Sequence, residues 1–181
     1  MKTEKSPACS RGTFFSAVVK KSGIMRNIIL FDDEKREDLL PLTYTRPAAS
    51  LRIGILTIAE KWARHLNGAV SFITQDYLAD KFPLSIAEDN WVINGTVLPT
   101  YPLVHLIQEL GNNEALMHEG ELLAARLSEE QFFHLTHNEE LEELNGFELE
   151  ATPVVSIRHP WDVFRLNEEA LQADFELLTR G

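Results

Sequence analysis

The stretch that most constrains this chain runs from residue 28 to residue 62, and it predicts a strand, a long loop and a helix in that order. It opens with the apolar run 28–31, which the charged segment 32–38 follows at once. A short β-branched run bounded by a polar loop is typical of a buried strand. The loop cannot continue as a regular helix, because Pro41 and Pro47 each lack the backbone donor that a helix needs.

Apolar residues at helical spacing follow Gly54 and predict a helix over residues 55–66. The apolar positions are Ile55, Ile58, Trp62 and Leu66. A strand, a long loop and a helix are the parts from which an α/β domain builds a site at the carboxyl end of its first strand. We therefore expect an α/β fold with a ligand site in the loop after the first strand.

Two further apolar runs, residues 69–74 and 90–93, predict the second and third strands. If the three strands are parallel, their carboxyl ends meet at one edge of the sheet. The polar residues at those ends are Asp32 with Asp33, Thr74 with Gln75, and Asn94 with Gly95. An Asn-Gly pair is also ordinary turn chemistry, so a turn without ligand contact is the alternative at the third strand.

The rest of the chain predicts more helices and one pair of strands. Short helices are expected over residues 77–82 and 103–110, and residues 114–117 and 121–126 are typical of a hairpin or an antiparallel edge. The acidic segment 127–144 is predicted to be partly helical.

The last segment predicts a helix that Asn167 caps, with two glutamates in its first turn. Leu171, Phe175 and Leu178 are spaced to form one apolar face of that helix.

Composition excludes several classes of protein. A net charge of −11 argues against sequence-independent nucleic-acid binding, which depends on basic side chains. The single cysteine, Cys9, rules out a disulfide within the chain and fits a reducing, cytoplasmic location. No apolar run approaches the ~20 residues of a membrane helix. With 44% hydrophobic residues over 181 positions, the chain is expected to form one domain.

Residues 1–24 differ from the rest because they are basic. We interpret them as a disordered extension, or as translation upstream of a true start at Met25, and a targeting segment is the weaker alternative. Residues 25–181 are expected to be the folded domain.

The loop and helix resemble the opening signature of sugar-phosphate nucleotidyltransferases. The residues that carry the resemblance are Leu39, Pro41, Leu42, Thr43 and Pro47, followed by Leu51, Gly54 and residues 57–62. More closely, residues 27–181 resemble the N-terminal domain of a GlmU-like family, whose members often carry a C-terminal left-handed β-helix acyltransferase. The resemblance implies a truncated, three-layer Rossmann-like fold, with a mostly parallel sheet and helices on both faces.

The resemblance also implies a reaction, in which a sugar 1-phosphate attacks the α-phosphorus of a nucleoside triphosphate and pyrophosphate leaves. Mg²⁺ is the implied cofactor, with Asp33 and Asp76 as candidate ligands. Arg36 and Arg46 are the candidate catalytic residues, in contact with the triphosphate. The candidate substrate-binding residues are Phe31, Asp32, Lys35, Thr43, Thr74, Gln75, Asn94 and Gly95.

The chain departs from the family pattern in two ways. Classical members have a Gly-x-Gly-Thr-Arg loop after the first strand, but this chain has no glycine between Asn27 and Arg52. In addition, Asn94 stands where typical members place an aspartate that binds Mg²⁺. Three readings follow: an active enzyme, a degenerate domain that binds nucleotide or sugar nucleotide without turnover, and a structural domain.

No hexapeptide repeat is present, so acetyl transfer is not expected of this chain. We expect any acyltransferase β-helix to belong to a longer or separate chain, and a homo-oligomer is a further candidate assembly. The sequence is interpreted as a fragment, a split gene product or a stand-alone domain.

Overall fold

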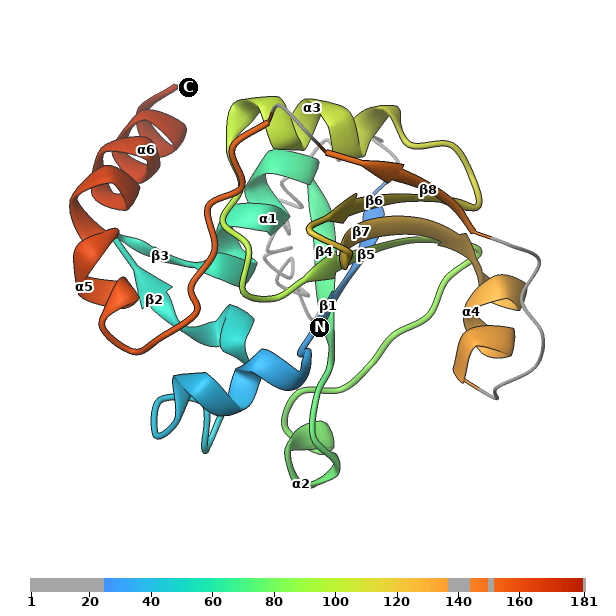
Figure 1. Ribbon diagram of the computed structural model, residues 1–181, viewed down its shortest axis with the longest axis horizontal. Coiled ribbons are helices and arrows are strands. Elements are labelled where there is room, and N and C mark those ends of the chain that lie inside the picture. The colour runs from blue at the N-terminus through green and yellow to red at the C-terminus, as the bar shows by residue number, and fades with distance from the viewer. Residues whose placement is uncertain (1–24, 137–143, 150–151, 181) are drawn as a thin grey trace, which may run out of the picture.

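The computed structural model describes residues 25–136, 144–149 and 152–180, and its centre is a six-stranded sheet (Figure 1). The strand order is β4-β1-β5-β7-β6-β8. The strands are β1 Arg26–Phe31, β4 Gly68–Ile73, β5 Asp89–Asn94, β6 Glu114–His118, β7 Glu121–Ser128 and β8 Asn145–Glu148. β1 runs parallel to β4 and β5, and β7 is antiparallel to both of its neighbours. The expectations for residues 1–24 and for the acidic run 137–143 lie outside the described residues.

Helices cover both faces of this sheet, which confirms the α/β fold class. They are α1 Ile58–Leu66, α2 Asp76–Ala79, α3 Tyr101–Glu109, α4 Glu129–Thr136, α5 Asp162–Arg165 and α6 Asn167–Thr179. Alternate residues of β1 point to opposite faces. Ile28 and Leu30 pack in the core that contains α1 and α3, while Ile29 packs in the core that contains Phe132 of α4. In the part of the chain that the structure describes, none of the helices combines the length and the apolar character needed to cross a membrane.

The three predicted strands and the predicted hairpin are confirmed. β6 and β7 pair antiparallel around Glu119 and Gly120, which both have positive φ, of 53° and 77°. Such a two-residue turn matches the twist of the strands that it joins. The hairpin lies inside the sheet, because β7 also pairs with β5 and β6 also pairs with β8. The sequence did not predict β8, whose residues are all exposed and therefore show no alternation of apolar and polar positions.

The first predicted helix begins later than expected. α1 starts at Ile58, because the hydroxyl of Thr57 accepts a hydrogen bond from the Glu60 N–H and the Glu60 carboxylate accepts one from the Thr57 N–H. This reciprocal capping box fixes the point at which the helix begins. Ile55 lies instead in the turn between the short strands β2 Arg52–Ile53 and β3 Leu56–Thr57.

The prediction for α6 was wrong in two respects. Asn167 is the first residue of the helix rather than its cap, and its side-chain oxygen accepts a hydrogen bond from the Gly54 N–H. Leu171 and Phe175 of the expected apolar face are 47% and 62% exposed, whereas Asp174 is 2% exposed. The buried side of α6 makes polar contacts, because the Asp174 carboxylate accepts hydrogen bonds from two backbone N–H groups of the β2–β3 hairpin.

The same carboxylate forms a buried ion pair with Lys61 of α1. Gly54, with φ of 77°, permits this packing, because a Cβ there would lie 2.7 Å from the Asp174 carboxylate. Asp174 therefore ties α6 to both α1 and the hairpin.

Replacing Asp174 with alanine should destabilise the fold by about 3–5 kcal/mol, because it leaves a buried ammonium and two backbone donors without their partner. The free energy of unfolding in urea measures the loss. The matched control is Glu176→Ala, an exposed change on the same helix that should stay within about 0.5 kcal/mol of the parent. Equal effects of the two substitutions would contradict the anchoring role.

Candidate active site

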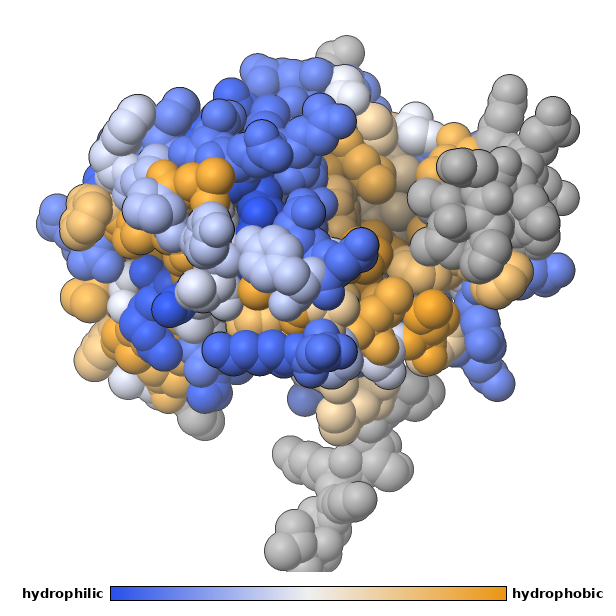
Figure 2. All heavy atoms as spheres, turned by 90° about the horizontal axis from the view of Figure 1, so that it is seen from below, coloured by the Kyte–Doolittle hydropathy of each residue, from blue (hydrophilic) through white to orange (hydrophobic). Residues whose placement is uncertain are grey.

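The candidate site lies at the carboxyl ends of β1 and β5. After β1 the chain continues to β4 on one side of the sheet, and after β5 it continues to β6 and β7 on the other side. The connections from β1 and β5, which are neighbours in the sheet, therefore run in opposite directions. Ligands of open α/β sheets bind in the crevice at such a switch point. Figure 2 shows the face of the molecule to which these strand ends point, with hydrophilic residues over one half and apolar residues gathered over the other.

A carboxylate and an amide from the two strand ends contact each other at this crevice. The Asn94 side chain donates a hydrogen bond to the Asp33 carboxylate at 2.8 Å. Its oxygen accepts bonds from the N–H and the hydroxyl of Thr96, at 2.9 and 2.7 Å, which fixes the orientation of the amide. Asp33 also accepts from the Lys35 N–H at 3.1 Å and so caps the 3-10 helix η1, Glu34–Leu39. The predicted convergence of strands one and three is confirmed.

Beside this pair lies a cavity of about 300 Å³, lined by Phe31, Asp33, Glu34, Lys35, Asn94, Glu121 and Leu122. Four of these residues were predicted as site residues. The ammonium of Lys35 forms an ion pair with Glu121 of β7. Sequence reasoning missed Glu121, because only the strand order places β7 next to β5.

Asp32 points into the protein rather than into the cavity. Its carboxylate accepts hydrogen bonds from the Ala48 N–H at 2.9 Å and from the Thr74 hydroxyl at 2.6 Å, and lies 3.2 Å from Nε of Arg36. Burial raises the pKa of Asp32 above its ordinary value, although the hydrogen bonds and the arginine act in the opposite direction. The predicted contact between the first and second strand ends is confirmed as a structural junction.

Arg36 and Thr43 contact each other inside the loop. The guanidinium donates to the Thr43 carbonyl and, at 2.9 Å, to the hydroxyl of Tyr77, while the Thr43 hydroxyl donates to the Arg36 carbonyl at 3.0 Å. Both residues are buried, at 4% and 0% exposure. These contacts hold the loop in shape, and the role of either residue on a triphosphate stays a prediction.

The other predicted residues lie at the surface or in tight packing. Arg46, Gln75 and Asp76 are exposed. The N–H of Gly95 donates to the Phe31 carbonyl at 2.8 Å, and a Cβ at Gly95 would lie 3.1 Å from that carbonyl oxygen. Gly95 thus allows the loop after β5 to pack closely on β1.

The described residues contain no group of three or more His, Cys, Asp or Glu side chains suited to a metal ion. Mg²⁺ in nucleotide enzymes needs only one or two carboxylates, because water and substrate phosphates complete its octahedron. Asp33 fits this requirement, since it lines the cavity and a fixed amide orients it.

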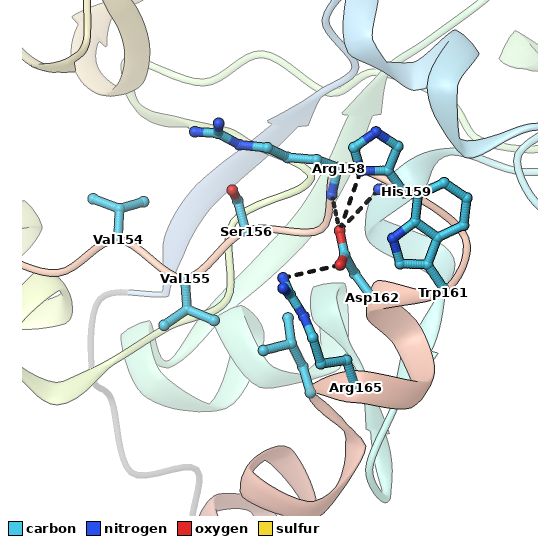
Figure 3. A pocket seen from close by; sticks show the side chains of 9 residues that line it. Val154, Val155, Ser156, Arg158, His159, Trp161, Asp162 and Arg165 are labelled. Atoms are coloured by element: carbon cyan, nitrogen blue, oxygen red, sulfur yellow. Dashed lines mark hydrogen bonds and ion pairs between the residues drawn. The ribbon is translucent and has the colours of Figure 1, made fainter.

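A second, larger cavity of about 570 Å³ lies along the segment before α5 (Figure 3). Its polar lining is Ser156, Arg158, His159, Trp161, Asp162 and Arg165. Asp162 is 2% exposed and accepts hydrogen bonds from the N–H groups of Arg158 and His159, both at 2.9 Å. Burial opposes the ionisation of Asp162, but these bonds and the nearby Arg165 outweigh it, so that its pKa is lowered.

Sequence reasoning assigned no function to this segment. The available signal was its composition, a histidine, a tryptophan and an aspartate between two arginines.

A mostly parallel sheet with helices on both faces and a cavity at its switch point defines this chain as a Rossmann-like α/β protein. Residues 28–181 match the model of the family described as sugar nucleotidyl transferase, and the chain belongs to that family. It is similar in structure to a Bacillus anthracis protein, provisionally designated a glucose-1-phosphate thymidylyltransferase, that was crystallised in complex with a sucrose. The TM-score is 0.50 at 12% sequence identity, over 81% of this chain and 95% of that one, which shows a shared fold. None of the curated proteins compared with the chain matches it.

The raised pKa of Asp32 predicts a specific pH dependence. Because the folded state holds the proton more tightly than the unfolded state does, the contribution of Asp32 to stability is fully present below the unfolded pKa and is lost as the pH rises through the folded pKa. The carboxyl ¹³C resonance of Asp32, assigned by its loss in Asp32→Asn, should titrate above the ordinary pKa of an aspartate. Titration below that value would contradict burial as the dominant cause.

Proposed function

We propose that this chain is a sugar-1-phosphate nucleotidyltransferase. The observation that carries the proposal is the cavity at the switch point, where Asn94 orients Asp33 beside the ammonium of Lys35, in a chain of the sugar nucleotidyl transferase family. In the reaction, an oxygen of the sugar 1-phosphate forms a bond to the α-phosphorus of a nucleoside triphosphate. The bond from that phosphorus to the bridging oxygen breaks, and pyrophosphate leaves.

The protein has little covalent work in such a transfer, because alignment and charge stabilisation account for most of the rate. Asp33 would hold Mg²⁺, which when bound offsets charge on the phosphates. Asn94 keeps the Asp33 carboxylate pointed at the cavity, and the ion pair of Lys35 with Glu121 lies at the cavity wall. Arg46, exposed on the loop after β1, remains a candidate contact for the triphosphate.

A second candidate function is the binding of nucleotide or sugar nucleotide without turnover. It is favoured by the inward orientation of Arg36, whose guanidinium contacts Thr43 and Tyr77. The neutral Asn94 at the strand end also favours it, since an amide oxygen is a weaker ligand for Mg²⁺ than a carboxylate.

Pyrophosphate release separates the two functions. Each nucleoside triphosphate is incubated with Mg²⁺ and a sugar 1-phosphate, beginning with thymidine triphosphate and glucose 1-phosphate. An active enzyme should release pyrophosphate, and Asp33→Asn should slow it about 100-fold, which corresponds to about 2.7 kcal/mol of barrier. Removing Mg²⁺ with a chelator should have an effect at least as large.

Two further variants sharpen this experiment. Asp38→Asn changes an exposed carboxylate of the same loop and should leave turnover unchanged. Asp76→Asn tests the second predicted metal ligand, and we expect a smaller loss than with Asp33→Asn, because Asp76 is exposed on α2. Binding without pyrophosphate release for any base would reject the transferase and leave the binding function.

A further inference from the structure

The loop after β1 offers little free positive charge at the strand-end cavity, because its exposed Arg46 is not among the residues that line this cavity. Arg36 is buried and occupied by contacts within the protein, and the ammonium of Lys35 is paired with Glu121. The loop also lacks the glycines whose backbone amides would otherwise surround phosphates. A chain that handles phosphates at this crevice needs cations from another segment.

The segment before α5 lies against the loop that follows β5. The Leu98 N–H donates to the Val155 carbonyl at 2.8 Å, and the Ile157 N–H donates to the Thr96 carbonyl at 3.0 Å. Figure 1 shows this segment descending from the side of α3 past α1 to α5. Val155 and Ile157, about 60 positions after β5 in the sequence, therefore lie beside the carboxyl end of that strand.

A narrow cavity of about 20 Å³ shares lining residues with both of the larger ones. It is lined by Asp33 and Asn94 of the strand-end cavity and by Ser156 and Arg158 of the larger cavity. Arg158 therefore lines both the narrow cavity and the larger cavity, and Arg165 lines the larger cavity. The narrow cavity thus places the candidate Mg²⁺ ligand Asp33 and Arg158 in one lining.

Both guanidinium groups keep donors for a ligand. Arg158 contacts Glu119 at 3.3 Å, and the two side chains are 49% and 64% exposed, so this ion pair contributes little and is easily replaced. Arg165 contacts Asp162 at 2.9 Å through one nitrogen and is 70% exposed. A guanidinium has five N–H donors in a fork that suits the oxygens of a phosphate.

The remaining lining suits a phosphate that carries a ring. In Figure 3 the Ser156 hydroxyl is drawn between the two guanidinium groups, where it adds a donor. The rings of His159 and Trp161 stack at 4.6 Å with an angle of 7° and form one exposed wall. Because two backbone N–H groups also bind Asp162, its contact with Arg165 involves one guanidinium nitrogen and leaves the other Arg165 donors for a ligand.

We propose that Arg158 and Arg165 bind the phosphate groups of the substrate, so that the segment before α5 supplies cations beside the strand-end cavity, where the loop after β1 provides few that are free. This inference rests on the proposed function and assigns new residues to that site. The shared ligand chemistry is a phosphate ester on a sugar or on a nucleoside, and either source satisfies the two arginines.

The test is equilibrium binding, measured by calorimetry in two arms, one with glucose 1-phosphate and one with a nucleoside triphosphate plus Mg²⁺. Arg158→Ala and Arg165→Ala should each weaken binding about 10- to 100-fold in at least one arm, the factor expected for losing a hydrogen bond to a charged group. The arm affected identifies the source of the phosphate. Arg158→Lys keeps the charge without the fork and should give an intermediate loss.

The matched control is Arg64→Ala, an exposed arginine on α1 that lines neither cavity, and it should bind as the parent does. Thermal unfolding checks that each variant is folded. Binding by the parent that survives both arginine substitutions overturns this inference and leaves the proposed function intact. If the parent binds no phosphate ligand in either arm, the proposed function and this inference both fail.

Discussion

The carboxylate of Asp32 is the junction on which the candidate site depends. It joins the end of β1 to the Thr74 hydroxyl after β4, to the Ala48 N–H, and to Arg36 within η1. The loop after β1 has no glycines, and these side-chain contacts hold its conformation. Burial of this charge is costly in isolation, and it is tolerated because hydrogen bonds and a cation surround it. The loop is thus held by a polar network.

Two neighbouring aspartates have different roles because their surroundings differ. Asp32 faces inward and is fully engaged, whereas Asp33 lines the cavity and is oriented by Asn94. Both residues follow the end of β1, and Asp33 has extended backbone, in which successive side chains point to opposite sides, so adjacent carboxylates need not share a function. The asparagine that replaces the expected aspartate is therefore interpreted as a positioning residue for Asp33.

The C-terminal part of the chain completes the molecule around this centre. Asp174 anchors α6 through Lys61 and the β2–β3 hairpin, and backbone bonds to Thr96 and Leu98 hold the segment before α5 beside β5. Membership of the sugar nucleotidyl transferase family covers this part too, since the match runs to residue 181. In our proposal, the family reaction draws on a different set of cations from the one that its usual loop provides.

The sequence by itself predicted β1, β4, β5, the β6–β7 hairpin and the helices other than α5, because short apolar runs, turn residues and helical spacing are local signals, but it missed β2, β3, β8 and α5. It also predicted that Asp33 and Asn94 meet at one edge of the sheet, since the carboxyl ends of parallel strands lie at the same edge, and their hydrogen bond confirms this contact. Only the tertiary structure decided that Arg36 turns inward, that α6 packs through Asp174 rather than Phe175, and that Arg158 lies near Asp33. Each of these depends on contacts between residues far apart in the chain, and local patterns carry no information about which distant group will satisfy a buried charge.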